Sequence, residues 1–174
     1  MVEKKLISKL KNKKQPSLTK KSEDISNIIN FRSSIKEYCE FSNFYHSSFI
    51  LDGKEWKTVE HYFQAQKCLK NNVKEQIRSL LTPKEAKQMG RKVLLRKDWD
   101  KVKIEIMMKA CSAKFKQSES LKKLLLSTGN KELREHTPKD KFWGDGGGNG
   151  RGRNELGKVL MKIRDELKNE ETNK

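Results

Sequence analysis

The chain has 174 residues, a formal net charge of +17 and a hydrophobic content of 33%. No apolar run approaches the roughly 18 residues of a transmembrane helix, and the basic N-terminus lacks the apolar segment of a secretory signal. The cysteines, Cys39, Cys68 and Cys111, are far apart and form no Cys-x-x-Cys pair, which argues against a disulfide framework and against a zinc site. We therefore expect a cytoplasmic protein with neither a metal nor another cofactor.

The distribution of charge separates one domain from two polar ends. Residues 1–21 contain eight lysines against a single acidic residue, Glu3, so we expect residues 1–25 to be a basic, disordered arm. Residues 26–168 suit one folded domain, and residues 169–174 are expected to be a polar tail. The net charge favours anionic partners. It leaves nucleic acid, a phosphorylated metabolite and plain solubility open, and the sequence does not reveal the oligomeric state.

Strands are predicted at the start of the domain. Residues 26–32 favour a short strand, and Asn43 then lies between two aromatic residues in Phe41-Ser42-Asn43-Phe44-Tyr45. Residues 49–56 are expected to form a hairpin, because Asp52-Gly53 suits the type I′ turn of a two-residue loop. The hairpin leads into a helix that begins at Thr58, a residue that caps helices well.

A polar stripe is the most informative feature of that helix. Glu60, Gln64 and Lys67 are spaced at i, i+4 and i+7, and aromatic and apolar positions flank them on both sides. A carboxylate, an amide and an amine beside aromatic rings suit the wall of a pocket, since buried charge is costly unless it is paired or used. An exposed surface pair explains the spacing alone equally well, because Glu and Lys are mostly exposed.

Further helices are expected over residues 73–81, from Thr82-Pro83 to about 91, from an Asp98 N-cap onwards and over about 118–127, followed by a short strand at 132–136. The apolar positions expected to face the core are Val73, Ile77, Leu80, Leu81, Trp99, Val102, Ile106, Ala110, Ala113, Leu121, Leu124 and Leu125. Trp99 could instead reach a ligand, although core packing is the favoured interpretation. Gly129 suits the position after a helix C-terminus.

A glycine-rich loop, residues 142–154, precedes the last amphipathic helix. Such a loop at a helix N-terminus offers free N–H groups to phosphate, and Arg151 and Arg153 would add bidentate donors. It lacks the Gly-Lys-Ser/Thr of a Walker A loop, and a flexible surface loop remains the alternative. Trp143 and Asp145 suit a nucleotide-like ligand, one stacking on a base and the other meeting a ribose. Asn154 is a good N-cap for the helix.

Several ordered motifs resemble the NADAR family, and most closely its YbiA-like branch of N-glycosidases linked to riboflavin-pathway intermediates. They are Phe-Ser-Asn-Phe at 41–44, Glu-His-Tyr-Phe-Gln-Ala-Gln-Lys at 60–67, Trp-Gly-Asp-Gly at 143–146 and the stretch 152–164. Arg96-Lys97-Asp98-Trp99 and Glu135-His136-Thr137 also match, so the resemblance covers about 26–167. Arg32 and Cys39 depart from the family pattern, where an aromatic residue and a glycine are usual. The resemblance implies an α-rich α+β domain of five or six helices with a small antiparallel sheet.

The resemblance also implies hydrolysis of an N-glycosidic bond between a phosphorylated ribose and a nitrogenous leaving group, as in early riboflavin-biosynthesis intermediates. Glu60 is the first choice to stabilise positive charge at the anomeric carbon and to activate water, with Asp145 second and Glu135 third. A first-turn position is expected to keep Glu60 ionised. Lys67 offers a second route, attack as a Schiff-base amine. The expected substrate contacts are Asn43, Phe44, Trp99, Glu135, Trp143, Arg151, Arg153 and Asn154.

Two other functions remain open at this point. One is removal of ADP-ribose from guanine in nucleic acid, the substrate elsewhere in the family, which the net charge favours. The other is a module that binds ADP-ribose or nucleic acid without catalysis. The sequence separates neither of these from a phosphorylated small-molecule substrate.

Overall fold

The computed structural model describes residues 25–148 and 151–173, so the basic N-terminal arm lies outside the described residues. The described chain begins with a 3-10 turn, η2 (Ile25–Asn27), and a second turn, η3 (Cys39–Phe41), follows the first strand. The strands are β1 (Ile28–Phe31), β2 (Phe49–Leu51), β3 (Lys54–Trp56) and β4 (Glu132–Glu135). The helices are α1 (Val59–Ala65), α2 (Asn71–Ser79), α3 (Pro83–Gly90), α4 (Trp99–Gln117), α5 (Glu119–Ser127) and α6 (Glu155–Thr172).

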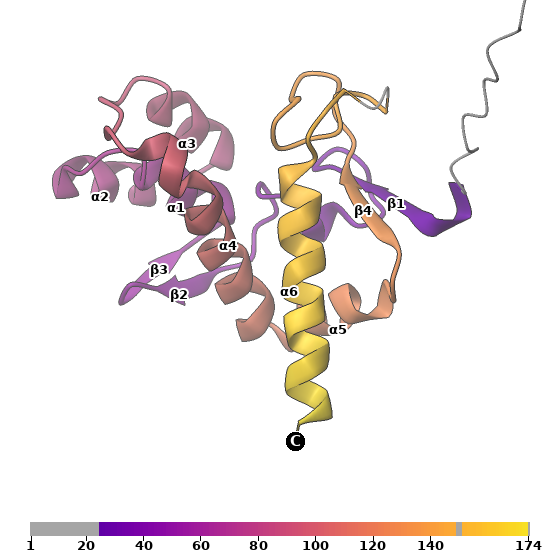
Figure 1. Cartoon of the computed structure of the whole chain (residues 1–174). Helices are drawn as coiled ribbons and strands as arrows, with labels where there is room; N and C mark the ends of the chain where they lie inside the picture. Colours follow the sequence, from indigo (N-terminus) through magenta and orange to yellow (C-terminus); the bar gives the residue numbers. More distant parts are fainter. Residues whose placement is uncertain (1–24, 149–150, 174) are drawn as a thin grey trace, which may run out of the picture.

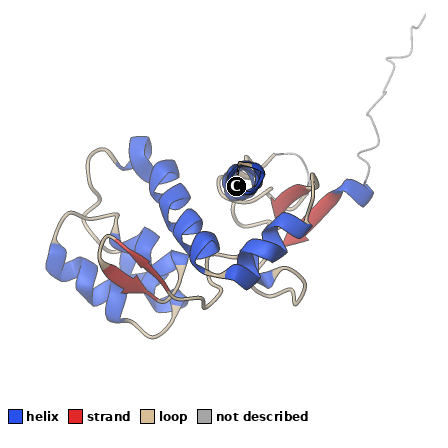
Figure 2. Ribbon diagram, turned by 90° about the horizontal axis from the view of Figure 1, so that it is seen from below, coloured by secondary structure: helices blue, strands red, loops and turns tan. Residues whose placement is uncertain are grey.

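Helix α4 stands between two groups of elements (Figures 1 and 2). On one side lie α1, α2, α3 and the β2–β3 hairpin, and on the other lie the β1–β4 pair, α5 and α6. One face of α4 packs on α1 and the other on α6, so a single apolar core runs through the domain. No described helix is long and apolar enough to cross a membrane.

Local sequence explains the hairpin and the start of α1. Asp52 and Gly53 adopt φ values of 52° and 71°, as a type I′ turn requires, and β2 pairs with β3 in antiparallel fashion. The Thr58 side chain accepts a hydrogen bond from the backbone N–H of His61, so the predicted N-cap is confirmed. The helix ends at Ala65, which places Lys67 in the following turn.

The fold prediction is confirmed: six described helices pack with a small antiparallel hairpin. The chain also contains a parallel pair that was not foreseen, in which β1 lies beside β4 with Ile28 opposite Glu132 and Phe31 opposite Glu135. These strands are about 100 residues apart in the sequence, so no local pattern could reveal their pairing. The pairing brings the end of β4 against the segment that follows β1.

Two local predictions were wrong. Leu81, expected in the core, is 78% exposed because α2 ends at Ser79 and the chain turns away before α3. Asp98 makes no side-chain capping bond, since its carboxylate binds the Arg96 guanidinium at 2.6 and 2.9 Å. Helix α6 continues through Thr172 and thus includes most of the expected polar tail.

Candidate active site

A pocket of about 600 Å³ opens between α1, α3, the end of β4 and the loops around them. It is lined by Arg32, Ser33, Ser34, Ser42, Asn43, Phe44, Glu60, Phe63, Gln64, Lys67, Lys87, Arg91, Met107, Glu135, Thr137, Pro138, Lys139, Asp140 and Trp143. Six of the eleven predicted site residues therefore meet here, namely Asn43, Phe44, Glu60, Lys67, Glu135 and Trp143. The volume falls within the usual range of small-molecule sites.

The polar stripe of α1, formed by Glu60, Gln64 and Lys67, lines one wall of this pocket. Of the two alternatives that the spacing left open, the structure therefore shows a pocket wall and not an exposed surface pair. Glu60 and Gln64 are 5% and 4% exposed, and Gln64 Nε2 donates a hydrogen bond to Glu60 Oε1 at 2.7 Å. Gln64 Oε1 is buried without a hydrogen-bond partner among the described residues. The wall thus holds polar groups that the protein itself satisfies only in part.

Burial shifts the pKa values of the ionisable side chains in this wall. It raises the pKa of the Glu60 carboxyl, although the Gln64 hydrogen bond and the charges of Lys87, Lys67 and Arg91 oppose the change. Burial therefore acts against the ionised form, which the first-turn position of Glu60 was expected to favour. Burial also lowers the pKa of the Lys67 amine, with the charge of Glu60 opposing it.

Glu135, the last residue of β4, supplies a second carboxyl group to the pocket. Burial, together with the negative charges of Asp140 and Glu60, raises its pKa to about 7. A carboxyl with such a pKa is partly protonated at neutral pH, so it can give or take a proton. Two carboxyl groups with raised pKa values thus line one pocket.

The loop that carries Asn43 is fixed from both sides. The Asn43 carbonyl accepts a hydrogen bond from the backbone N–H of Glu60 at 3.1 Å. On the other side Lys114, a 1% exposed residue of α4, donates to the carbonyls of Glu40 and Ser42 at 2.5 and 3.0 Å. Burial lowers the pKa of Lys114 to about 8. The sequence gave no sign of this anchor, since Lys114 is one of 40 basic residues in the chain.

Helix α3 adds two cationic groups that the sequence-based prediction missed. Lys87 and Arg91, spaced at i and i+4, both line the pocket, and the Lys87 ammonium lies 5.3 Å from the centre of the Phe44 ring. Neither forms an ion pair with any residue that the structure describes. Gly90 lets α3 approach α1 closely, because a Cβ atom there would lie 2.0 Å from Gln64 Oε1.

Aromatic rings form the remaining wall. Phe63 lies edge-to-face with Trp143 at a centroid distance of 5.3 Å, and it also contacts Trp99 at 5.0 Å. The Lys67 ammonium lies 5.8 Å from the ring centres of both Phe63 and Trp99. Trp99 is 7% exposed and does not line the pocket, so it packs in the core behind Lys67.

The described N–H groups that lead into α6 are not free, which argues against the predicted phosphate cradle at this helix N-terminus. The backbone N–H groups from residue 152 to residue 156 donate in turn to the carbonyls of Asp145, Lys141, Gly144, Phe142 and Trp143, at 2.7–3.1 Å. The N-terminus of α6 is therefore closed by its own loop. No anion can use those donors without breaking the loop apart.

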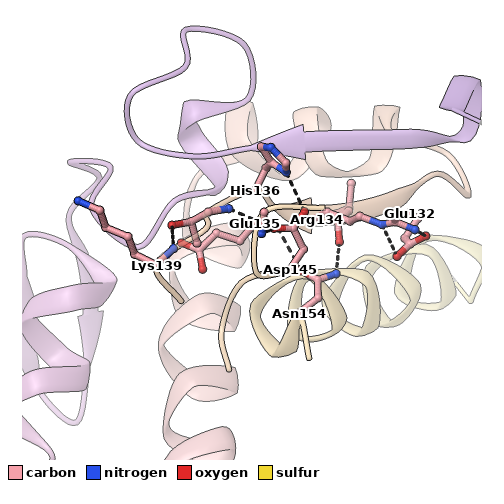
Figure 3. Close-up of polar contacts among 10 residues, drawn as sticks. Glu132, Arg134, Glu135, His136, Lys139, Asp145 and Asn154 are labelled. Carbon is pink, nitrogen blue, oxygen red and sulfur yellow. Dashed lines mark hydrogen bonds and ion pairs between the residues drawn. The ribbon is translucent and has the colours of Figure 1, made fainter. Parts of the chain in front are cut away.

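Asp145 organises this loop instead of facing the pocket (Figure 3). Its carboxylate lies 2.8 Å from His136 Nδ1 and accepts hydrogen bonds from the backbone N–H groups of Thr137 and Gly147. Burial alone would raise the pKa of Asp145, but these three hydrogen bonds outweigh it and hold the pKa below the ordinary value. These contacts hold the Asp145 carboxylate within the loop, and Asp145 does not line the pocket of about 600 Å³.

Three further predicted contacts also lie outside the pocket. The Asn154 amide accepts from the Glu135 N–H and donates to the Leu133 carbonyl, so it ties α6 to β4 and makes no capping bond (Figure 3). Arg153 donates to Glu155 at 3.1 Å and lies over the Phe142 ring at 4.7 Å. Arg151 is exposed and is absent from the lining of the pocket.

Within residues 25–148 and 151–173, no group of three or more His, Cys, Asp or Glu side chains could hold a metal ion. The pocket offers carboxyl, amine, amide, guanidinium and hydroxyl groups.

Comparisons with known proteins agree with this chemistry. Residues 30–168 match the NADAR domain family. The chain is 49% identical over 142 residues to the N-glycosidase YbiA of Escherichia coli K12, which covers 80% of this chain and 88% of that protein. It is 41% identical over 128 residues to a riboflavin biosynthesis protein of Vibrio vulnificus, covering 72% of this chain and 35% of the relative. The NMR structure of E. coli YbiA matches with a TM-score of 0.79 and 47% identity, over 85% of this chain and 89% of that one.

Proposed function

The chain belongs to the NADAR family and is a hydrolase of N-glycosyl bonds, and we propose that it cleaves the bond between a phosphorylated ribose and a nitrogenous leaving group. The observation that carries the proposal is the pairing of Glu60 and Glu135 in one pocket beside Lys67. Such cleavage builds positive charge at the anomeric carbon and needs a proton on the leaving nitrogen. The site contains a group suited to each requirement.

Glu135 serves as the proton donor. A pKa of about 7 keeps a substantial fraction of the carboxyl protonated at neutral pH, and the proton passes to the leaving nitrogen as the glycosidic bond breaks. Glu60 acts in its ionised form: burial raises its pKa, and the Gln64 hydrogen bond and the charges of Lys87, Lys67 and Arg91 favour the carboxylate against burial. It stabilises the anomeric cation and takes a proton from the attacking water.

Lys67 offers a second route to the same products. Burial lowers its pKa, which increases the share of the neutral amine. That amine can attack the anomeric carbon of an opened ribosylamine; the bond from this carbon to the original nitrogen then breaks, the nitrogen leaves as a protonated, free amine, and the carbon remains joined to Lys67 as a Schiff base. Water then releases the sugar from the lysine. Borohydride reduction during turnover distinguishes the two routes. A covalent adduct on Lys67, absent from Lys67→Ala, supports the Schiff base, whereas no adduct together with an active Lys67→Ala excludes it.

The phosphate of the substrate binds to α3. No cation of the pocket forms an ion pair among the described residues, and Lys87 and Arg91 lie one turn apart on α3, so a phosphate between them would satisfy both. Arg32, where the family usually has an aromatic residue, also lines the pocket and adds a third cation. These residues replace Arg151 and Arg153 in the phosphate role. Asn43 and Trp143 then contact the sugar and the base.

The substrate class that fits best is a ribosylaminopyrimidine phosphate of early riboflavin synthesis. A pocket of about 600 Å³ suits a ligand of that size, and the Vibrio vulnificus relative is named as a riboflavin biosynthesis protein. The test is incubation of the purified protein with such a compound and detection of free base and phosphorylated ribose by mass spectrometry. Loss of both products in Glu60→Gln, with unchanged circular dichroism, is expected.

ADP-ribosylated guanine in nucleic acid is the second candidate substrate, and the net charge of +17 favours it. The same assay with ADP-ribosylated DNA separates the two. If ADP-ribose is released from DNA faster than the pyrimidine is released from its ribose phosphate, the proposal of a riboflavin-type substrate is overturned. Tight binding of either compound without any product, unchanged in Glu60→Gln, overturns catalysis itself and leaves a binding module.

A further inference from the structure

A second, larger cavity lies on the other side of the turn that follows α1. It is an open groove of about 940 Å³ between α2, α3 and the irregular segment 92–98. Apolar side chains from all three parts line it, among them Leu69, Val73, Met89, Val93, Leu94 and Leu95. It shares no lining residue with the active-site pocket.

The leucines of this groove are unusually open to solvent. Leu69, Leu94 and Leu95 are 68%, 84% and 49% exposed, and they are three of the six large apolar residues exposed in the described chain. Exposed apolar side chains that gather in one concave place mark interaction surfaces, whereas single ones need no explanation. A concave floor suits an inserted segment of chain better than a flat surface.

The rim of the groove is cationic. Lys70, Lys92 and Lys97 line it, are exposed, and form no ion pair with any residue between 25 and 148 or between 151 and 173. The single carboxylate in the lining, Asp98, is held by the Arg96 guanidinium at 2.6 and 2.9 Å. The groove therefore combines an apolar floor with uncompensated positive charge.

We propose that this groove is a docking site for an acidic, amphipathic segment of a partner protein. Helix-in-groove recognition uses an apolar stripe to fill the floor, and acidic residues beside the stripe would meet Lys70, Lys92 and Lys97. In the Vibrio vulnificus relative the matched region is 35% of the protein, so a domain of this family is there joined to further polypeptide. A separate partner protein that docks in this groove would hold the present chain close to other polypeptide without a covalent link.

Charge argues against the other occupants. The N-terminal arm, with eight lysines and one acidic residue in 1–21, would place like charges on the lysine rim. A second copy of a chain with a net charge of +17 meets the same repulsion. An anionic bilayer matches the charge, but its surface does not follow a groove.

The test uses the full-length protein and two fluorescent synthetic peptides of about 16 residues. Both contain the same leucines and glutamates; in one the leucines form a single helical stripe, and in the other they are spread evenly around the helix. Anisotropy titration at physiological salt is expected to give binding of the striped peptide at least about tenfold tighter than that of the spread one. Equal affinities reveal simple charge attraction and overturn the proposal.

Matched variants test whether the striped peptide binds in the groove. The double variant Leu94→Ser/Leu95→Ser and the variant Lys92→Glu should each weaken binding of the striped peptide by about tenfold or more. Leu81→Ser and Lys84→Glu remove an equally exposed leucine and an exposed α3 lysine outside the groove, and they should change binding less than about twofold. Similar losses in both sets overturn the groove as the site. N-glycosidase activity should stay unchanged in all four.

Two further measurements distinguish the rejected occupants. Sedimentation of phosphatidylglycerol vesicles that depends on Leu94 and Leu95, without binding of the striped peptide, identifies a membrane surface instead. Concentration-dependent dimerisation that disappears in Leu94→Ser/Leu95→Ser identifies a second copy. Either result overturns the proposal, whereas monomeric protein that binds the striped peptide and ignores vesicles supports it.

Discussion

The α1 wall and the glycine-rich loop are both dense in polar groups, but the protein treats them differently. In the loop, Asp145 accepts three hydrogen bonds and the N–H groups that follow are bonded to nearby carbonyls. In the wall, Gln64 Oε1 has no hydrogen-bond partner, and Lys87 and Arg91, which face the same pocket from α3, have no ion pair among the described residues. The difference teaches that a functional site is recognised by polar groups that remain available, and a structural one by groups that are satisfied internally.

Glu60→Gln tests whether the α1 wall is catalytic and should have the largest effect on turnover. It keeps the shape of the side chain but removes the charge that stabilises the anomeric cation, so kcat should fall by about 100-fold or more. The measurement is steady-state product release, with thermal unfolding as the control for folding. Turnover within about threefold of wild type in a folded variant would exclude Glu60 as a catalytic group.

Glu135→Gln should have opposite effects on activity and on stability. Removing the proton donor lowers kcat by about tenfold to 100-fold and abolishes the fall of activity as the pH rises through about 7. A folded-state pKa raised from 4.5 to about 7 means that stability is present below pH 4.5 and is lost as the pH rises through 7. At pH 8 the variant should therefore be more stable than wild type, by about 1–3 kcal/mol.

Urea unfolding at pH 5 and at pH 8 measures that stability difference. The gain should appear at pH 8 and shrink at pH 5, because glutamine resembles the protonated carboxyl group. A variant that is destabilised at both values, or that keeps the descending alkaline limb of activity, contradicts the raised pKa as the source of catalysis.

Arg91→Ala and Arg153→Ala form a matched pair, one guanidinium from the pocket and one from the loop region. Arg91→Ala should raise KM for the phosphorylated substrate by about tenfold, because a charge-assisted contact is lost. KM for the dephosphorylated compound should hardly change. Arg153→Ala should leave both values within about twofold, since its guanidinium binds Glu155 and Phe142. The reverse pattern would return the phosphate to the glycine-rich loop.

Local sequence predicted the features that depend on near neighbours. The Asp52-Gly53 turn, the Thr58 cap and the stripe of Glu60, Gln64 and Lys67 each arise within a few residues, and all are found in the structure. Resemblance to a family then led to the correct fold and reaction class. Spacing along the chain thus suggested one wall of the pocket, although by itself it fitted an exposed surface pair equally well.

The other walls depend on long-range contacts that no local pattern contains. Lys87 and Arg91 resemble ordinary surface charges in a basic chain until Gly90 brings α3 against α1. The loop was wrongly interpreted because a glycine-rich stretch before a helix has the same appearance whether its N–H groups are free or bonded to carbonyls. The N–H groups are bonded here because residues 141–145 cross the start of α6 and place their carbonyls beside them, and this path of the chain is a long-range feature.

Asp145→Asn should have the smallest effect on turnover and a clear effect on stability, which makes it the counterpart of Glu60→Gln. Its hydrogen bonds hold the pKa of Asp145 below 3.8, so the carboxylate adds stability above that pH and loses it as the pH falls through the folded-state value. The variant should be less stable by about 1–2 kcal/mol at pH 7. This deficit should narrow in acid, while kcat/KM of the folded protein stays within about threefold. A 100-fold loss of turnover without loss of stability would make Asp145 the partner carboxylate of Glu60, and the loop would then belong to the active site.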